Sequence, residues 1–383
     1  MFDISVQQDE LMKSLSSIKN TVSKPKPKDE DNDFDIYVKM ELKNNKLQLT
    51  GTNMTDISVA NCNIVSNNGD KEINSLIQFN TLYTLIETLD ENTVIDIADT
   101  EKGKVNINYA NRIKPIQVAS ADNSKFLIKE PNDKILQSCT IKYSDLKDII
   151  EHFNNIIGTT SSNPVFNCIN IHIDNSKVIA KGFDGCVTSR MCLFCKILSH
   201  KGSLQTFVDF ANLKKVFSSL DDNQNVVIEV TSNYFIITQS NETHYIKLNT
   251  GKYPNIEKYM PDKYPSIYEL NRSDLLKALY RIKAISKHAT TSTFTFNDNN
   301  IQIEVNTSKG SNIENVDCIK AGKSISKIAF DTQVMIDTLK QFSTDTVRLC
   351  FYALNNCVLM PQAKQTYLYR ILLRAMTIKN KTK

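Results

Sequence analysis

Cysteine pairs are the first residues here whose type and spacing could support chemistry. Cys192 and Cys195 have the spacing of a metal or redox pair, and Cys186 lies shortly before them. A structural zinc site needs four ligands, and no second pair in the chain has the required spacing. The segment is also typical of a strand, in which residues three apart point to opposite faces. We therefore expect buried structural thiols and no metal.

The other motifs of catalytic type are incomplete. Gly322–Ser324 has the ending of a phosphate-binding loop, but Asp317 stands where that loop needs its first glycine. The five histidines lie far apart, and none stands in a recognisable nucleophile context. A hydrolase or nuclease is favoured only by the acidic clusters Asp29–Asp31 and Asp221–Asp222, which are typical of turns. We therefore expect no enzyme activity and no cofactor.

Lysine and arginine are the remaining candidates, because they can contact phosphates. Lys24, Lys26 and Lys28 form a compact basic loop that the acidic run Asp29–Asp31 follows at once. The net charge of +4 and the pI of about 8.4 permit a polyanion partner without requiring one. Solvated helix surfaces are the alternative explanation for the other cations. These cations, on or beside predicted helices, are Lys13, Lys19, Lys142, Lys147, Lys214, Lys215, Lys277, Arg281, Lys283 and Lys340.

A sixfold repeat predicts the helices that carry these residues. Apolar residues recur at i, i+3 or i+4 and i+7, which places one apolar stripe on each short helix. Such a repeat indicates a duplicated architecture. Five of the six copies carry cations, and the second has Glu87 and none. The stripes are Leu11, Leu15 and Ile18; Leu82, Leu85 and Leu89; Leu146, Ile150 and Phe153; Leu213, Phe217 and Leu220; Leu275, Leu279 and Ile282; and Met335, Leu339 and Phe342.

Segments that follow each helix alternate Val, Ile and Leu with polar residues, which predicts half-buried strands. The first, third and fifth helices are followed by strand pairs, and the others by an acidic turn and a strand. The order helix, strands, helix, strands therefore occurs three times. The predicted pairs are Lys46–Gly51 with Asp56–Ile64, Lys177–Gly182 with Val187–Leu193, and Asn300–Val305 with Ile313–Ile319.

Two segments typical of linkers divide this pattern into three. They are Asn123–Ile135 and Lys252–Pro265, and the second carries three prolines. We expect three domains of similar fold, at residues 1–131, 132–263 and 264–383. Each would be large enough to bury its own core.

Composition places the chain among ordinary globular proteins, with a hydrophobic fraction of 41% and a charged fraction of 23%. No apolar run approaches the length of a membrane span, and Met1–Ser5 lacks the blocks of a signal peptide. The nine cysteines are then most simply reduced thiols. We expect a cytoplasmic protein with no membrane partner.

Four phrases carry a resemblance to a known family, the bacterial sliding clamp or beta subunit of DNA polymerase III. They occur in the family's order and spacing, and the resemblance covers essentially the whole chain. It runs collinear with the threefold repeat. The phrases are Leu47–Met54 followed by Ile57–Val59, Val178–Gly185, Gly251–Asn255 with Met260–Pro261, and Ser273–Leu279.

The resemblance implies an α+β chain of three tandem domains of the DNA clamp fold, each with two helices packed on antiparallel sheets. Two chains would form a head-to-tail homodimeric ring around double-stranded DNA, without sequence preference. The implied function is a DNA polymerase processivity factor that tethers the replicative polymerase, the clamp loader and repair proteins through short peptides. The alternative is a clamp-fold paralogue that serves as an interaction scaffold without replicative loading.

The resemblance also implies two sites. One site would bind DNA, and the alternative explanation for its basic loop is a solvated loop. The other would bind peptides, and the alternative for its apolar members is plain core packing. The DNA-binding residues would be Lys24, Lys26, Lys28, Lys13, Lys147, Lys214, Lys215, Lys277 and Arg281. The peptide-binding groove would comprise Phe166, Phe183, Gly185, Cys186, Val187, Thr188, Pro254, Lys258, Tyr259, Leu368, Arg370 and Leu372.

Some positions depart from the family pattern. The family usually reads Asp-Gly-His-Arg-Leu where this chain has Asp184–Thr188, so the chemistry of the groove is altered. Pro115 falls on the strand that matches the family's dimer edge, and proline cannot donate to a ladder. Extra residues also follow Arg374. These changes bear on peptide specificity and ring strength more than on the fold.

Overall fold

The computed structural model describes residues 3–22, 36–68, 73–100, 103–110, 112–126, 128–154, 156–157, 163–174, 177–183, 187–194, 199–201, 204–285, 291–308, 310–325, 327–353, 356–362 and 367–376. They form two compact units, Met1–Ser144 with Ile197–Leu248 and Asp145–Lys196 with Asn249–Lys383. The second predicted domain therefore contributes chain to both units. Within the described ranges, no helix is long and apolar enough to cross a membrane.

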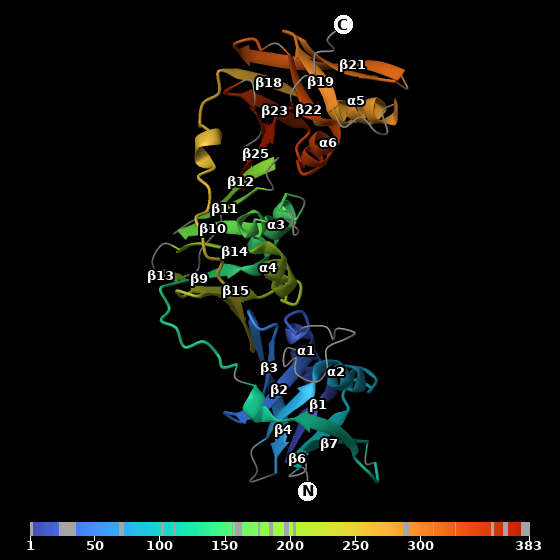
Figure 1. Ribbon diagram of the computed structural model, residues 1–383, viewed down its shortest axis with the longest axis vertical. Coiled ribbons are helices and arrows are strands. Elements are labelled where there is room, and N and C mark those ends of the chain that lie inside the picture. The colour runs from blue at the N-terminus through green and yellow to red at the C-terminus, as the bar shows by residue number, and fades with distance from the viewer. Residues whose placement is uncertain are drawn as a thin grey trace. The chain divides into compact units, whose positions relative to one another are not determined.

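The first unit is built on antiparallel strands with three helices (Figure 1). Its helices are α1 (Gln8–Ile18), α2 (Phe79–Glu87) and α4 (Phe210–Phe217). Its strands are β1 (Ile4–Gln7), β2 (Tyr37–Lys43), β3 (Lys46–Thr52), β4 (Ile57–Asn67), β5 (Asn74–Gln78), β6 (Val94–Thr100), β7 (Lys104–Tyr109), β8 (Ile116–Ala121), β9 (Gln137–Lys142), β13 (Ser199–Lys201), β14 (Leu204–Asp209), β15 (Asn225–Val230), β16 (Tyr234–Gln239) and β17 (Glu242–Lys247).

One continuous sheet joins the first and second predicted domains inside this unit. Its strand order is β1-β6-β7-β8-β5-β2-β3-β4-β17-β16-β15-β9-β13, and β1 also pairs with β4. The junction is the β4–β17 pair, in which Val59 lies opposite Thr243 and Ser58 opposite His244. Strand β17, which follows the predicted linker Asn123–Ile135, thus pairs directly with β4, which precedes that linker.

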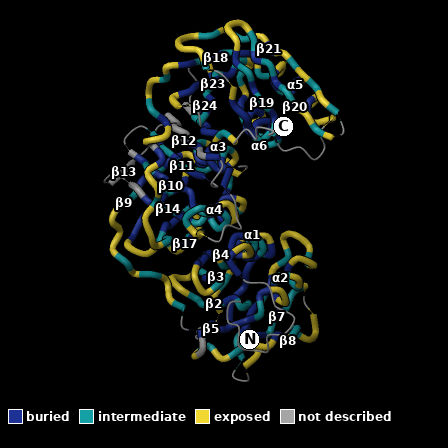
Figure 2. Tube along the Cα trace, turned by 45° about the horizontal axis from the view of Figure 1, so that its top comes forward, coloured by how far each residue is buried: buried dark blue, intermediate teal, exposed yellow. Residues whose placement is uncertain are grey.

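The helices of this unit bury the predicted stripes. Leu11, Leu15 and Ile18 of α1 are fully buried, and they pack with residues of α2 and of strands β1 to β7 in one core. Figure 2 shows buried residues along the strands and exposed residues at the turns. Asp209 begins α4, because its side chain accepts a hydrogen bond from the Asn212 amide at 2.9 Å.

Pro115 lies one residue before β8, and so differs slightly from its expected place on the strand itself. β8 begins at Ile116, which pairs with Ile107 of β7. A proline at this position removes no hydrogen bond from the described ladder.

The second unit repeats the combination of helices and antiparallel strands. Helix α3 (Tyr143–Phe153) begins at its boundary, and α5 (Arg272–Ile285) and α6 (Thr332–Lys340) follow. Its strands pair in the order β10-β11-β12-β25-β24-β23-β18-β21-β20-β19-β22. They are β10 (Cys168–Asp174), β11 (Lys177–Phe183), β12 (Val187–Phe194), β18 (Ser266–Asn271), β19 (Thr291–Phe296), β20 (Asn300–Thr307), β21 (Gly310–Gly322), β22 (Lys327–Asp331), β23 (Thr346–Phe351), β24 (Asn356–Pro361) and β25 (Tyr367–Arg374).

The β12–β25 pair joins the second and third predicted domains within this unit. Val187 lies opposite Leu373 and Thr188 opposite Leu372. The predicted linker 252–265 also belongs to this unit and contains one short 3-10 helix, η4 (Glu257–Tyr259). The described residues expected to form the peptide groove therefore all lie in one compact unit.

Candidate functional site

Two predicted groove residues, Phe166 and Phe183, pack with Tyr253 in an aromatic cluster. The Phe166 and Phe183 ring centres are 4.5 Å apart, and those of Phe183 and Tyr253 are 5.8 Å apart. Both contacts are edge-on, a favourable arrangement for aromatic pairs. Phe183 is buried and Phe166 half-buried. Tyr253 donates its hydroxyl to the Lys181 carbonyl at 3.0 Å, and burial raises the pKa of Tyr253 well above its ordinary value.

Strands β12 and β25 hold a second group of predicted groove residues. Val187 and Leu372 are both buried, and backbone pairing places Leu368 opposite Cys192. The side chains of Thr188 and Leu368 lie outside the described set, as do Gly185 and Cys186 altogether. Of the altered segment Asp184–Thr188, the structure therefore describes only Val187 and the backbone of Thr188.

The segment around η4 supplies the exposed members. The Lys258 ammonium lies 4.8 Å from the centre of the Tyr259 ring, which is a cation–π distance. Tyr259 is 45% exposed, and Pro254 is also exposed. An exposed tyrosine beside a lysine presents an apolar surface and a positive charge together.

Arg370 fixes this segment against β25. Its Nη1 donates to the carbonyls of Met260 and Pro261 at 3.3 Å each, and its Nη2 donates to Asp262 Oδ1 at 3.1 Å. Met260 is 3% exposed and packs in a small apolar core with Leu372 and two further buried residues. Arg370, predicted as a groove residue, thus positions the segment that carries Tyr259.

A cavity of about 190 Å³ lies beside Lys258 and Tyr259. Its other lining residues are Tyr352, Ala353, Asn356 and Val358. Sequence reasoning missed these four, since no helical stripe or family phrase includes them: Tyr352 and Ala353 follow β23, and Asn356 and Val358 lie on β24. One signal was available: Tyr352 directly follows a strand that ends in the buried Phe351, and Tyr352 is 64% exposed.

The predicted DNA-binding residues are mostly exposed. Lys13 on α1, Lys214 and Lys215 on α4, and Lys277 and Arg281 on α5 are exposed, whereas Lys147 on α3 is half-buried. Lys24, Lys26 and Lys28 lie outside the described residues.

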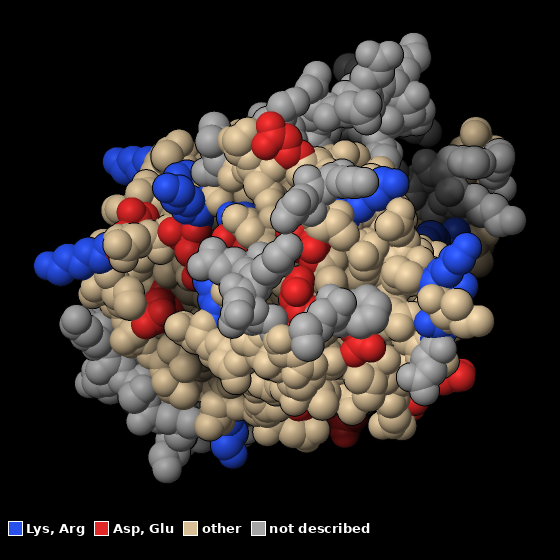
Figure 3. All heavy atoms as spheres, turned by 90° about the horizontal axis from the view of Figure 1, so that it is seen from below, with Lys and Arg blue, Asp and Glu red and all other residues tan. Residues whose placement is uncertain are grey.

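Two of the basic helices are joined in the first unit. Asn20, just beyond α1, donates to the Lys215 carbonyl and to Ser218 Oγ, both at 3.2 Å. This contact links the α1 and α4 regions, which carry Lys13, Lys214 and Lys215. The face of the molecule in Figure 3 shows basic and acidic side chains interspersed among other residues.

The basic character of the helices in the second unit is weaker. Arg281 is paired with Glu314 at 2.7 Å, and Lys277 lies 3.8 Å from Asp274. α3 carries three acidic residues, Asp145, Asp148 and Glu151, beside Lys147. Burial, with Glu151 and Asp145 nearby, raises the pKa of Asp148. Positive charge is therefore least offset on α4, which carries Lys214 and Lys215 and no acidic residue.

The described residues contain no group of three or more His, Cys, Asp or Glu that could hold a metal ion. Cys62, Cys318, Cys350 and Cys357 are free thiols in the described part of the chain. Burial raises the pKa of Cys62 and of Cys350 to about 12. Burial thus disfavours the thiolate, the reactive form of the side chain, at Cys62 and Cys350.

Comparison with known proteins identifies this architecture. Residues 257–375 match the family model described as DNA polymerase III beta subunit, C-terminal domain. The DNA polymerase III subunit beta of Pseudomonas aeruginosa superposes with a TM-score of 0.83 at 17% identity, covering 98% of this chain and 100% of that one. The sliding clamp of Bacillus subtilis gives 0.81 at 17% identity, covering 98% and 99%. The fold is therefore that of the DNA clamps.

Curated relatives agree with this fold. The beta sliding clamp of Staphylococcus aureus is 21% identical over 211 residues, and that of Staphylococcus epidermidis is 22% identical over 214. Each match covers 54% of this chain, which spans about half the length of the curated relatives it matches. The resemblance inferred from sequence is confirmed in two respects: residues 257–375 match the C-terminal domain of the DNA polymerase III beta subunit, and the chain has the fold of the bacterial sliding clamps.

Proposed function

We propose that this chain is a DNA polymerase processivity factor, a non-catalytic sliding clamp of the bacterial cytoplasm. The observation that carries the proposal is the agreement in fold with solved clamps over 98% of the chain. Residues 1–131, 132–263 and 264–383 would be its three domains, and two copies would close head to tail into a ring around duplex DNA.

The charge pattern supports a sliding contact with DNA. Contacts to phosphate position a protein without reading sequence, and enclosure of the duplex supplies residence time, so a lining of modest charge is sufficient. Lys13, Lys214 and Lys215 are exposed on helices linked by Asn20. Lys147, Lys277 and Arg281 would add to this lining, and Lys24, Lys26 and Lys28 would extend it on a loop. The net charge of +4 agrees with modest binding.

The groove supports recognition of short peptides from a polymerase, a clamp loader and repair proteins. An extended peptide docks a few apolar anchors in pockets, and those anchors carry most of the binding energy. The cavity of about 190 Å³ at Tyr259 and Tyr352 would take one such side chain. Lys258 beside it favours an acidic residue next to the anchor.

Native mass and retention on DNA test this function. A ring predicts a particle of twice the chain mass of 43.5 kDa at micromolar concentration. It also predicts that protein loaded on nicked circular DNA stays bound in high salt and is released when the circle is cut. A particle of one chain's mass that is not retained on the circle would contradict the proposal.

A further inference from the structure

A network of buried polar side chains crosses the β4–β17 junction of the first unit. His244 on β17 lies opposite Ser58 on β4, and both residues are 1% exposed. His244 Nδ1 is 2.7 Å from Ser58 Oγ, which is 2.5 Å from the hydroxyl oxygen of Thr21, just beyond α1. The apolar core that buries α1 contains no described residue beyond Val118. The link between the end of α1 and β17 is therefore polar.

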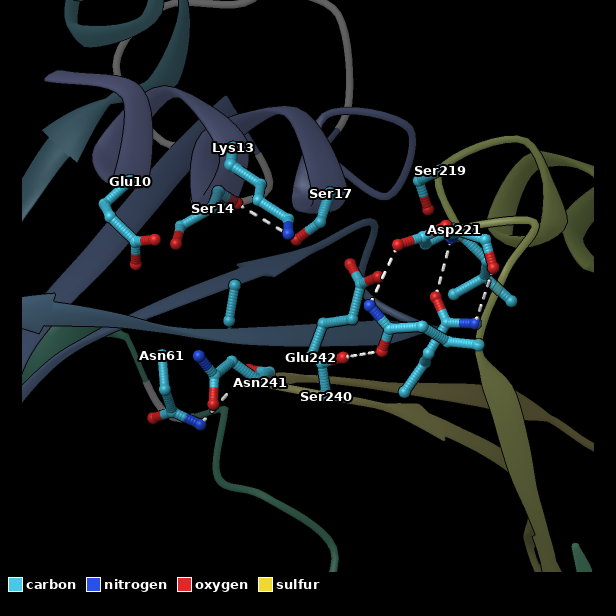
Figure 4. A pocket seen from close by; sticks show the side chains of 14 residues that line it. Glu10, Lys13, Ser14, Ser17, Asn61, Ser219, Asp221, Ser240, Asn241 and Glu242 are labelled. Atoms are coloured by element: carbon cyan, nitrogen blue, oxygen red, sulfur yellow. Dashed lines mark hydrogen bonds between the residues drawn. The ribbon is translucent and has the colours of Figure 1, made fainter. Parts of the chain in front are cut away.

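Glu242 lies at the other end of this network. Its Oε2 atom is 3.4 Å from His244 Nε2, an ion-pair distance when the imidazole is protonated. Both atoms are buried, and within the described residues neither has a hydrogen-bond partner. Glu242 lines a cavity beside α1 together with Glu10, Lys13 and Asp221, and Figure 4 shows it between α1 and Asp221. The imidazole is thus placed between a hydroxyl group and a carboxylate.

Other ionisable groups also face His244. Asp56 on β4 and Lys215 on α4 line a cavity of about 10 Å³ together with His244. Burial raises the pKa of Asp56. On β16, the residue opposite His244 is the apolar Ile237. Asp56 is therefore the second group near the junction whose protonation has to be separated from that of His244.

The protonation state of His244 decides in which direction the hydrogen bonds of the network run. A neutral imidazole with its proton on Nε2 accepts at Nδ1 from Ser58, and Ser58 in turn accepts from Thr21. A protonated imidazole donates at both nitrogens, so Ser58 must accept from Nδ1 and donate to Thr21. The hydroxyl proton of Thr21 then has no acceptor, because Ser58 is its only hydrogen-bond partner among the described residues.

The two states therefore stabilise different contacts. Protonation strengthens the contact of His244 with Glu242, because a charged donor meets a carboxylate. It weakens the link to Thr21, because a buried donor without an acceptor is unfavourable. Histidine is the side chain whose charge most readily changes between about pH 5 and pH 8. Since Ser58 is buried, a substrate cannot reach its hydroxyl, and the network acts on conformation and not as a hydrolytic triad.

We propose that Thr21, Ser58, His244 and Glu242 form a pH-sensitive switch, which holds the end of α1 on the β4–β17 junction while His244 is neutral and releases it when His244 is protonated. Release would loosen residues 19–22 and leave the pairing of β4 with β17 intact. The switch is a property of the folded chain and does not depend on DNA or on the peptide groove.

Hydrogen–deuterium exchange of the full chain at about pH 8 and about pH 5.5 tests the switch. The reporters are the amides of Thr21 and Val22, which donate to the Ile18 carbonyl at 3.0 and 3.3 Å. After correction for the intrinsic rate of exchange, we expect the protection of these amides to fall at least about fivefold at the lower pH.

His244→Gln should abolish this fall in protection. A glutamine amide can accept from Ser58 and donate to Glu242 as the neutral imidazole does, but it does not take up a proton in this range. Asp56→Asn and His152→Gln are the controls, and both should retain the fall. Asp56 faces the same small cavity as His244, and His152 lies in the second unit.

A second variant keeps the test decisive if His244→Gln fails to fold. Thr21→Val removes the hydroxyl proton that lacks an acceptor in the protonated state, so protection at residues 21 and 22 should be similar at both pH values. The proposal would be overturned by wild-type protection that does not fall, by an equal fall in folded His244→Gln or Thr21→Val, or by loss of the fall in Asp56→Asn.

Discussion

Gly182 on β11 lies directly beneath Ile157, in the segment that follows α3. A Cβ atom added to Gly182 would come within 2.6 Å of Ile157 Cδ1 and 2.9 Å of Phe153 Cδ1. Gly51 on β3 has the equivalent relation to Val22, at 2.6 Å, after α1. Both glycines belong to the phrases that carry the family resemblance. The repeated glycine thus has a physical role, which is to let the end of a helix pack closely on a strand.

Gly182→Ala should destabilise the protein by about 1–3 kcal/mol, the range for overpacking of a core. Gly51→Ala should cost less, because one methyl group of Val22 has to move, whereas Gly182 is covered by two large side chains. Urea unfolding of both variants measures the difference. A Gly182→Ala protein as stable as the wild type would show that α3 does not pack on β11 in this way.

Arg370→Ala should weaken peptide binding although Arg370 is engaged with the protein itself. Its loss removes three hydrogen bonds that hold residues 260–262, and the segment carrying Tyr259 loses its anchor. We expect about a tenfold loss of affinity for a polymerase-derived peptide, measured by fluorescence polarisation. The control is Arg374→Ala, an exposed arginine on the same strand, with no expected effect.

Alanine substitutions at Tyr259 and Leu372 should distinguish an effect on peptide binding from an effect on folding. Tyr259→Ala removes a side chain that is 45% exposed, so it should weaken peptide binding with little change in stability. Leu372 is 6% exposed in an apolar core, so Leu372→Ala should lower the free energy of unfolding by about 2–5 kcal/mol. Thermal unfolding and peptide titration of both variants check this. Unfolding of Tyr259→Ala would instead favour plain core packing at that position.

Lys214 and Lys215 should contribute to the salt dependence of DNA binding. Replacing both with alanine should reduce the slope of log affinity against log salt by up to about 1.8, because each phosphate contact contributes about 0.9. Binding to a short duplex at several salt concentrations measures the slope. Lys104→Ala, an exposed change on β7, serves as the control. An unchanged slope in the double variant would show that α4 is not part of the DNA-binding surface.

Acid should destabilise the protein through His152. Burial lowers the pKa of this side chain to about 4, against about 6.5 in an unfolded chain. Its Nε2 lies 2.8 Å from Ser189 Oγ, in a contact between α3 and β12. Between about pH 6.5 and pH 4, the His152 side chain is protonated in the unfolded chain but stays neutral in the folded protein. The stability contributed by neutral His152 is therefore complete above pH 6.5 and is lost as pH falls toward 4.

Urea unfolding between pH 7 and pH 4 measures this effect. His152 should contribute a slope of at most about 1.4 kcal/mol per pH unit, and His152→Gln should flatten the profile by that amount. His172→Gln, on β10, is the matched control. A profile that His152→Gln leaves as steep as before would show that other groups govern acid unfolding.

The sequence by itself determined the local elements. The apolar stripes placed the six helices correctly, and strand periodicity located β3 with β4, β11 with β12 and β20 with β21 to within a few residues. These signals are local, because amphipathic period and turn chemistry depend on residues only a few positions apart. The phrases of the family resemblance extended this to the fold, since four of them occurred in order along the whole chain.

Only the tertiary structure decided which side chains meet. Tyr352 and Asn356 line the cavity at Tyr259 although about ninety residues separate them in sequence. Arg370 proved to hold the linker through contacts with residues about 110 positions away along the chain. Such contacts depend on strand order and register, where a shift of one residue turns every side chain to the opposite face. The local periodicity of the sequence does not specify which strands pair or in which register.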